Sequence, residues 1–134
     1  MGESCLQATR FGRTATISFL TSIQPYDVLA ENLSRGLHTL FLLDLDTESG
    51  RYMRVQQALL LLLDVEGKTG LGILEKDTLA IGLARIGALD QLVVAGSIEN
   101  ILETDFGSPP HSLVIPGELH FTESEAIEVL LKPS

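Results

Sequence analysis

The sequence has 134 residues, 45% of them hydrophobic, and its 18 acidic and nine basic side chains give a net charge of −9. This length suits one compact domain and is too short for two ordinary ones. Because affinity for a polyphosphate comes largely from lysine and arginine, the acidic balance argues against nucleic acid as a ligand and favours a basic protein partner.

Cysteine content and hydropathy indicate the cellular compartment in which the protein is expected. Cys5 is the single cysteine, so no intrachain disulfide can form, and nothing at the amino end has the basic-then-apolar pattern of a secretory signal. The apolar run from Ala58 ends at Asp64, far short of the roughly 20 residues that cross a bilayer. We therefore expect a cytoplasmic chain without a transmembrane segment.

The first third of the chain predicts a strand, a helix and a second strand. The β-branched stretch 14–20 is typical of a short strand, and the helix after it has Pro25 near its start and Gly36 at its end. The continuous apolar run 37–46 predicts a central strand covered on both faces.

A second helix is expected from Met53, with good helix formers and a glycine stop at Gly67. It contains five consecutive leucines, Leu59 to Leu63. Successive helical residues are rotated by about 100°, so these leucines surround the helix and predict that a second surface covers it.

The remaining elements complete an α/β pattern. Residues 78–87 and 91–96 predict two strands joined by a tight turn, hence an antiparallel hairpin. Ser97, with Asn100 three residues on, is expected to cap a short helix, and Thr122 with Glu125 has the capping-box spacing of a closing helix. Strands alternating with helices, plus a hairpin, predict a single α/β domain with a mixed sheet.

The segment "DFGSPPHSLVIPG", residues 105–117, begins with the triplet that protein kinases use to hold magnesium. The other kinase signatures, a glycine-rich loop, a strand lysine and an upstream His-Arg-Asp loop, do not accompany it. Pro109 and Pro110 push their predecessors toward extended geometry, so the segment predicts a turn leading into a strand at 112–115. The role of His111 stays open at this point.

Other motifs favour ordinary readings. "GKTGLG", residues 67–72, follows a helix and has Leu62 where a phosphate loop needs glycine, so a flexible connector is expected. Cys5 lies near the amino end, and no serine sits in a Gly-x-Ser-x-Gly elbow, so covalent hydrolase chemistry has no support.

Two groups of polar side chains are candidate ligand sites. A metal site assembled from two histidines and two glutamates matches no common zinc spacing, so no metal is expected; its members would be His111, His120, Glu118 and Glu123. Three aspartates follow strands or turns, where α/β sheets place ligand clefts, but solvated carboxylates there are ordinary; they are Asp44, Asp46 and Asp105. Catalytic residues stay unassigned.

Several longer stretches resemble the carboxyl-terminal half of the diphthine synthase family, methyltransferases that act on a modified histidine of translation elongation factor two. The resemblance runs nearly end to end and is most distinctive in "GLHTL", "ARIG" and "DFGSPPHSLVIPG". Departures are Ala88 where serine is usual, Gln56 where asparagine is usual, and a shortened stretch before Pro25.

The resemblance implies the carboxyl-terminal domain, with a mixed and mostly five-stranded sheet, of a two-domain tetrapyrrole-methylase-like fold that binds S-adenosylmethionine between its domains. On this view residues 1–134 hold only half of the cofactor site, the amino-terminal domain is absent, and the chain is inactive alone. The positions matching cofactor contacts are Leu43, Ile86 and His111, with Ala84 as a neighbour. The resemblance also implies a homodimer.

Two alternatives remain open from the sequence. His111 is either a cofactor contact or a turn histidine hydrogen-bonded to its own loop. The chain is either one domain of a methyltransferase or a non-catalytic binding and assembly module that keeps the fold and the dimer surface.

Overall fold

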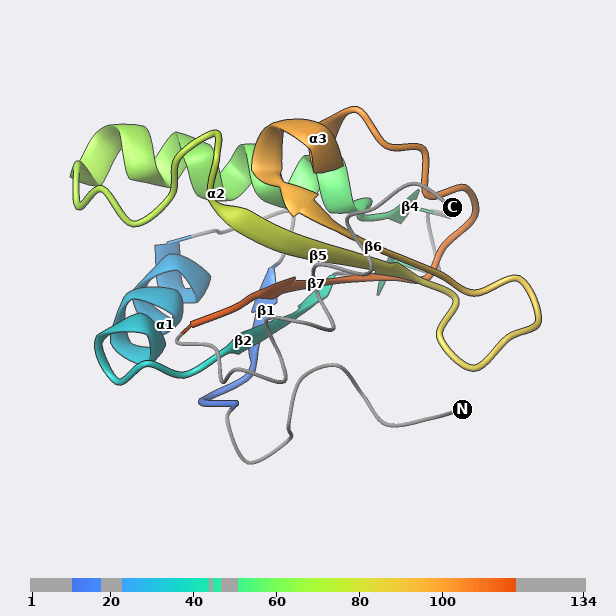
Figure 1. The fold of residues 1–134 in the computed structure, drawn as a ribbon, viewed down its shortest axis with the longest axis horizontal. Helices are drawn as coiled ribbons and strands as arrows, with labels where there is room; N and C mark the ends of the chain where they lie inside the picture. Colours follow the sequence, from blue (N-terminus) through green and yellow to red (C-terminus); the bar gives the residue numbers. More distant parts are fainter. Residues whose placement is uncertain (1–10, 18–22, 44, 47–50, 118–134) are drawn as a thin grey trace.

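A five-stranded mixed sheet with helices packed on it forms the body of the protein, in a computed structural model that describes residues 11–17, 23–43, 45–46 and 51–117 (Figure 1). The sheet order is β1-β2-β7-β5-β6. Its strands are β1 (Ala15–Ile17), β2 (Thr39–Leu43), β5 (Leu79–Ala84), β6 (Leu92–Ser97) and β7 (His111–Ile115). The helices are α1 (Ile23–Ser34), α2 (Val55–Thr69) and α3 (Ile98–Leu102), and β3 (Leu45–Asp46) pairs with β4 (Arg51–Tyr52) in a separate two-stranded sheet.

Strand directions confirm the mixed α/β class. β1 runs parallel to β2, whereas β2–β7, β7–β5 and β5–β6 are antiparallel pairs. The parallel pair is joined through α1, as a crossover connection requires, and β5 and β6 form the expected hairpin.

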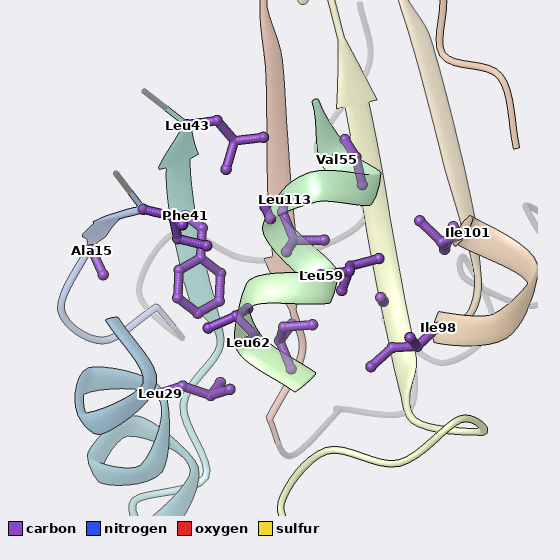
Figure 2. Close-up of a cluster of buried hydrophobic side chains, with 14 of the residues drawn as sticks. Ala15, Leu29, Phe41, Leu43, Val55, Leu59, Leu62, Ile98, Ile101 and Leu113 are labelled. Atoms are coloured by element: carbon purple, nitrogen blue, oxygen red, sulfur yellow. The ribbon is translucent and has the colours of Figure 1, made fainter. Parts of the chain in front are cut away.

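The main core lies between one face of the sheet and the helices. Figure 2 shows Leu59 and Leu62 of α2 in a cluster with Phe41 of β2 and Leu113 of β7. All four of these side chains are fully buried. Burying apolar area on this scale is the main stabilising contribution in a domain of this size.

The helix α2 ends later than the sequence suggested. The predicted stop at Gly67 is wrong, because the helix continues to Thr69 and Gly70 forms the left-handed cap with φ of 70°. The Gly70 amide donates to the carbonyl of Glu66 at 2.8 Å. A glycine inside a helix costs only about 1 kcal/mol, so the stop falls where the left-handed conformation is needed.

The leucine run of α2 is covered on one side. Leu59 and Leu62 are fully buried, whereas 57% of Leu60 is exposed. Leu61 and Leu63 are partly buried against the main core, so in the described part of the chain Leu60 is the most exposed of the five leucines. The expectation that a second surface covers the helix stays a prediction.

The apolar run 37–46 is not one strand. β2 ends at Leu43, and Leu45–Asp46 pairs with Arg51–Tyr52 in the small sheet. β2 does lie inside the large sheet, but Leu42 is 46% exposed, so the predicted cover of both faces is incomplete. A continuous apolar pattern does not show where a chain leaves a sheet, because that depends on its partners.

The helix cap and the hairpin loop can also be compared with the sequence-based predictions. Ser97 caps α3 as expected, its hydroxyl accepting from the Asn100 amide at 3.2 Å. The hairpin loop spans residues 85–91 and is longer than the predicted tight turn. The closing helix with Thr122 and Glu125 lies outside the described residues, as does Cys5. None of the helices in the described part is both long and apolar enough to cross a membrane.

Candidate functional site

Three of the four candidate residues form a row across adjacent strands. Ala84 at the end of β5 is the register partner of His111 at the start of β7. On the other side of β7, Leu42 pairs with Ser112, which brings Leu43 beside His111. The end of the sheet where β2 and β5 stop and β7 begins is therefore the candidate site.

The side chains of this row differ in what they offer a ligand. Ala84 is fully buried and Leu43 is 7% exposed, and both belong to the main core. Ile86, two residues beyond β5, is 57% exposed. Leu43 and Ala84 can thus meet a ligand chiefly through their main chain, whereas Ile86 presents an apolar side chain.

The ring of His111 is buried and uses both nitrogens within the chain. Nδ1 accepts from the Val55 amide at 3.3 Å, at the first residue of α2. Nε2 lies 3.1 Å from the carbonyl of Gly107 and donates to it, because Nδ1 is already the acceptor. This arrangement corresponds to one neutral tautomer.

Burial lowers the pKa of His111 below its usual value of 6.5. The carbonyls of Gly107 and Ser108 act in the opposite direction but do not outweigh burial, and the positive charges of Arg54 and Arg85 lower the pKa further. His111 is therefore neutral near pH 7 and joins α2 to the loop before β7. Its ring makes the contacts expected of a turn histidine.

The loop 105–110 is ordered by its own polar groups. Oδ1 of Asp105 accepts from the Gly107 amide at 2.8 Å, which closes a turn of the kind aspartate favours. Phe106 is buried, and its ring lies where a Cβ on Gly82 would be, 2.3 Å away. The triplet "DFG" thus forms a structural turn, and the predicted strand after it is confirmed as β7.

Two arginines that the sequence analysis did not single out bind the carbonyls of this loop. Nη1 of Arg54 donates to the carbonyl of Gly107 at 3.0 Å, and Nη1 of Arg85 donates to that of Phe106 at 2.7 Å. An arginine directly after an apolar strand was the available signal for Arg85. Its carbonyl partners are invisible in a sequence.

The connector after α2 is held by a carboxylate. Glu66 accepts from the amides of Gly72, Ile73 and Leu74 at 2.8–2.9 Å, and from the hydroxyl of Tyr26 at 2.9 Å. Desolvation raises the pKa of Glu66, but these hydrogen bonds outweigh it and lower the pKa below 4.5. The segment 67–72, expected to be a flexible connector, therefore begins inside α2 and is fixed at its end by Glu66.

Two further features lie apart from the row. A cavity of about 230 Å³ is formed by residues 13–16 with Gln24, Pro25 and Val28, where β1 meets α1, and none of the four candidates lines it. Among the described residues no cluster of three or more histidine, cysteine or acidic side chains could hold a metal ion. Four members of the candidate groups considered from the sequence lie outside the described residues: Asp44, Glu118, His120 and Glu123. Asp46 belongs to β3.

Sequence comparison relates the chain to archaeal diphthine synthases. It is 41% identical to the Methanocaldococcus jannaschii diphthine synthase over 136 aligned positions, which cover 97% of this chain and 53% of that protein. It is 45% identical to the Methanosarcina barkeri diphthine synthase, with 94% of this chain and 50% of that protein covered. No family model matches the sequence.

Solved structures agree with the sequence comparison. An Entamoeba histolytica protein provisionally assigned as a diphthine synthase superposes with a TM-score of 0.89 at 33% identity, covering 97% of this chain and 54% of that one. A second crystal structure, of diphthine synthase, gives 0.81 at 33% identity, covering 94% of this chain and 47% of that one. The chain thus spans about half the length of the proteins it matches.

Proposed function

We propose that this chain, a homologue of the diphthine synthases over nearly its whole length, supplies the carboxyl-terminal part of an S-adenosylmethionine-dependent methyltransferase of diphthamide biosynthesis. The observation that carries the proposal is 40–45% identity to curated diphthine synthases across 94–97% of the chain. The fold likeness, with a TM-score of 0.89, supports it independently of the sequence.

The end of the sheet fits half of a cofactor site. Ile86 offers an exposed apolar side chain, and Leu43 and Ala84 end neighbouring strands, where main-chain groups can bind the edge of a base. The His111 ring offers no unused nitrogen, so we assign its contact to the main chain or the ring edge. The remaining contacts would come from the other half of the enzyme.

S-adenosylmethionine supplies a methyl group on a sulfonium, which an in-line displacement transfers without strong acid–base help. The residues of this chain would therefore act by binding, orienting and excluding water from the bound cofactor. Ile86 would cover an apolar surface, and the strand ends would fix its position. This is consistent with the four candidate residues, which include no nucleophile–base pair.

The proposed protein substrate is the modified histidine of translation elongation factor two, in the cytoplasm. The net charge of −9 favours a partner with a basic surface. We also propose a homodimer in which the exposed Leu60 of α2 lies in or near the interface. A leucine that is 57% exposed beside buried leucines is the local feature that supports this placement.

Calorimetric titration with S-adenosylmethionine tests the proposal. The 134-residue chain alone should bind weakly or not at all and transfer no methyl group, and the chain joined to the amino-terminal half of the Methanosarcina barkeri relative should bind with micromolar affinity. Micromolar affinity of the isolated chain would refute the half-site. No binding by the folded two-part protein would refute the methyltransferase function and favour a non-catalytic module.

A further inference from the structure

The residue that follows β5, Arg85, has an unusual backbone conformation. It is the single non-glycine residue in the described part of the chain with positive φ, at 52°. This left-handed region is unfavourable for residues with a side chain, so a structure keeps it only where other contacts hold it.

Those contacts join two loops that are distant in sequence. On one side, Nη1 of Arg85 donates to the carbonyls of Phe106 and Ser108. On the other, Nε lies 2.9 Å from Oδ2 of Asp90, and Nη2 donates to the Asp90 carbonyl at 3.1 Å. The side chain is only 15% exposed, so the guanidinium lies between the loops 85–91 and 105–110.

The main chain of Arg85 also contacts the loop 105–110. Its amide donates to the carbonyl of Pro110 at 2.8 Å, one step beyond the register pair of Ala84 and His111. Figure 1 shows both loops at the same end of the sheet, beyond β5 and before β7. Arg85 therefore connects the end of the sheet to the two segments that contain Ile86 and His111.

The geometry points to Arg85 as a positioning residue of the cofactor half-site: by joining the loops 85–91 and 105–110, it fixes Ile86 relative to His111. This inference rests on the proposed function for its ligand. Arg85 does not itself contact the cofactor. A planar guanidinium with five donors in fixed directions suits this role, and a lysine, with a single ammonium, cannot reach both loops at once.

A role in stability alone predicts something different. An arginine that only stabilised the fold would, on substitution, lower the melting temperature and leave the folded protein's loops and affinity unchanged. A positioning residue changes loop protection and ligand affinity while the fold persists. The test must therefore measure the folded protein.

The first measurement is amide hydrogen exchange on the 134-residue chain. In Arg85→Lys, exchange at Gly87, Ala88 and Gly107 should accelerate at least tenfold, while the ladder between β5 and β6 stays protected. Arg35→Lys, an exposed arginine paired with Glu31 at 3.9 Å, is the control and should change loop exchange less than twofold. Unchanged loop exchange in folded Arg85→Lys would overturn the inference.

The second measurement is the dissociation constant for S-adenosylhomocysteine in the two-part protein. Arg85→Lys should raise it about tenfold and raise the KM for S-adenosylmethionine more than it lowers kcat, because a binding geometry is loosened and no reacting group is removed. An unchanged dissociation constant alongside accelerated loop exchange would refute the positioning role. If the unsubstituted two-part protein binds nothing, the proposed function fails, and the exchange data still decide whether Arg85 fixes the loops.

A folding failure is covered by a second variant. Arg85→Gly accepts a φ of 52° without strain and removes every side-chain contact, so it should fold and show the same accelerated exchange as Arg85→Lys. If neither variant folds, Arg85 is a residue of global stability and the inference is wrong.

Discussion

Replacing His111 by alanine tests whether its ring holds the start of α2. The substitution removes the acceptor of the Val55 amide and the donor to the Gly107 carbonyl, at 3.3 and 3.1 Å. It also leaves a void beside Phe106, whose ring centroid lies 5.8 Å from that of His111. Each lost hydrogen bond is worth about 1 kcal/mol and the void adds a similar amount, so we expect a destabilisation of about 2–4 kcal/mol.

Urea denaturation followed by circular dichroism measures this loss, which corresponds to roughly 10 °C in melting temperature for a chain of this size. His111→Asn is the matched variant, because its side-chain oxygen can replace Nδ1 as the acceptor for Val55; it should recover about half of the loss. A destabilisation below about 0.5 kcal/mol for His111→Ala would refute the assignment of both contacts. In the two-part enzyme the same alanine should also weaken cofactor binding by about 1–2 kcal/mol, because the loop 105–110 loses the hydrogen bond by which the ring holds it.

The titration of His111 gives the first experiment a pH signature. Its folded-state pKa lies below the usual 6.5, so the unfolded chain takes up a proton at a higher pH than the folded chain. The contribution of neutral His111 to the free energy of unfolding is therefore fully present above about pH 6.5. It is lost as the pH falls through the folded-state pKa. His111→Asn should remove this part of the pH dependence, and an unaltered profile would show that another group causes it.

Three other substitutions test separate contacts. Gly82→Ala should destabilise the fold by about 1–3 kcal/mol in urea denaturation, because the new Cβ would lie 2.3 Å from the Phe106 ring; a neutral effect would contradict this packing. Glu66→Gln should destabilise the fold by about 1–2 kcal/mol at pH 7, because it weakens the hydrogen bonds that the carboxylate accepts. The parent should lose this stabilisation as the pH falls below 4.5 through the lowered pKa of Glu66, and the variant should not; unfolding curves at pH 3 and pH 7 measure the difference. Sedimentation at micromolar concentration should give about twice the chain mass of 14.5 kDa, and Leu60→Glu should shift it to the monomer; a folded monomer before substitution would refute the dimer.

Local contacts made parts of the fold predictable. The Ser97 cap depends on Asn100 three residues away, and the hairpin of β5 and β6 joins neighbours in the chain. The sequence pattern therefore contained both the signal and its cause. The end of α2 was misplaced because two glycines, Gly67 and Gly70, were available, and only the backbone conformation distinguishes them.

The candidate site was only partly predictable, because its contacts join distant segments. The sequence resemblance gave Leu43, Ala84 and His111, and the sheet register brings these three together. One partner of the His111 ring, Val55, is 56 residues away, and Arg85 reaches a carbonyl 21 residues away. No periodicity or spacing rule encodes such pairs, since they depend on which strands become neighbours.

Two of the stretches that carry the resemblance contain both sides of the contact between Arg85 and the loop 105–110. "ARIG" contains Arg85 and "DFGSPPH" contains His111 and the carbonyls that both side chains bind. Because Arg85 donates to the carbonyls of Phe106 and Ser108, the conformations of the two stretches are coupled. Likeness to the diphthine synthases at these letters therefore argues first for a shared main-chain geometry at this end of the sheet. Since the ring of His111 is already engaged, that geometry, and the exposed Ile86 it presents, is what this chain would contribute to a cofactor site.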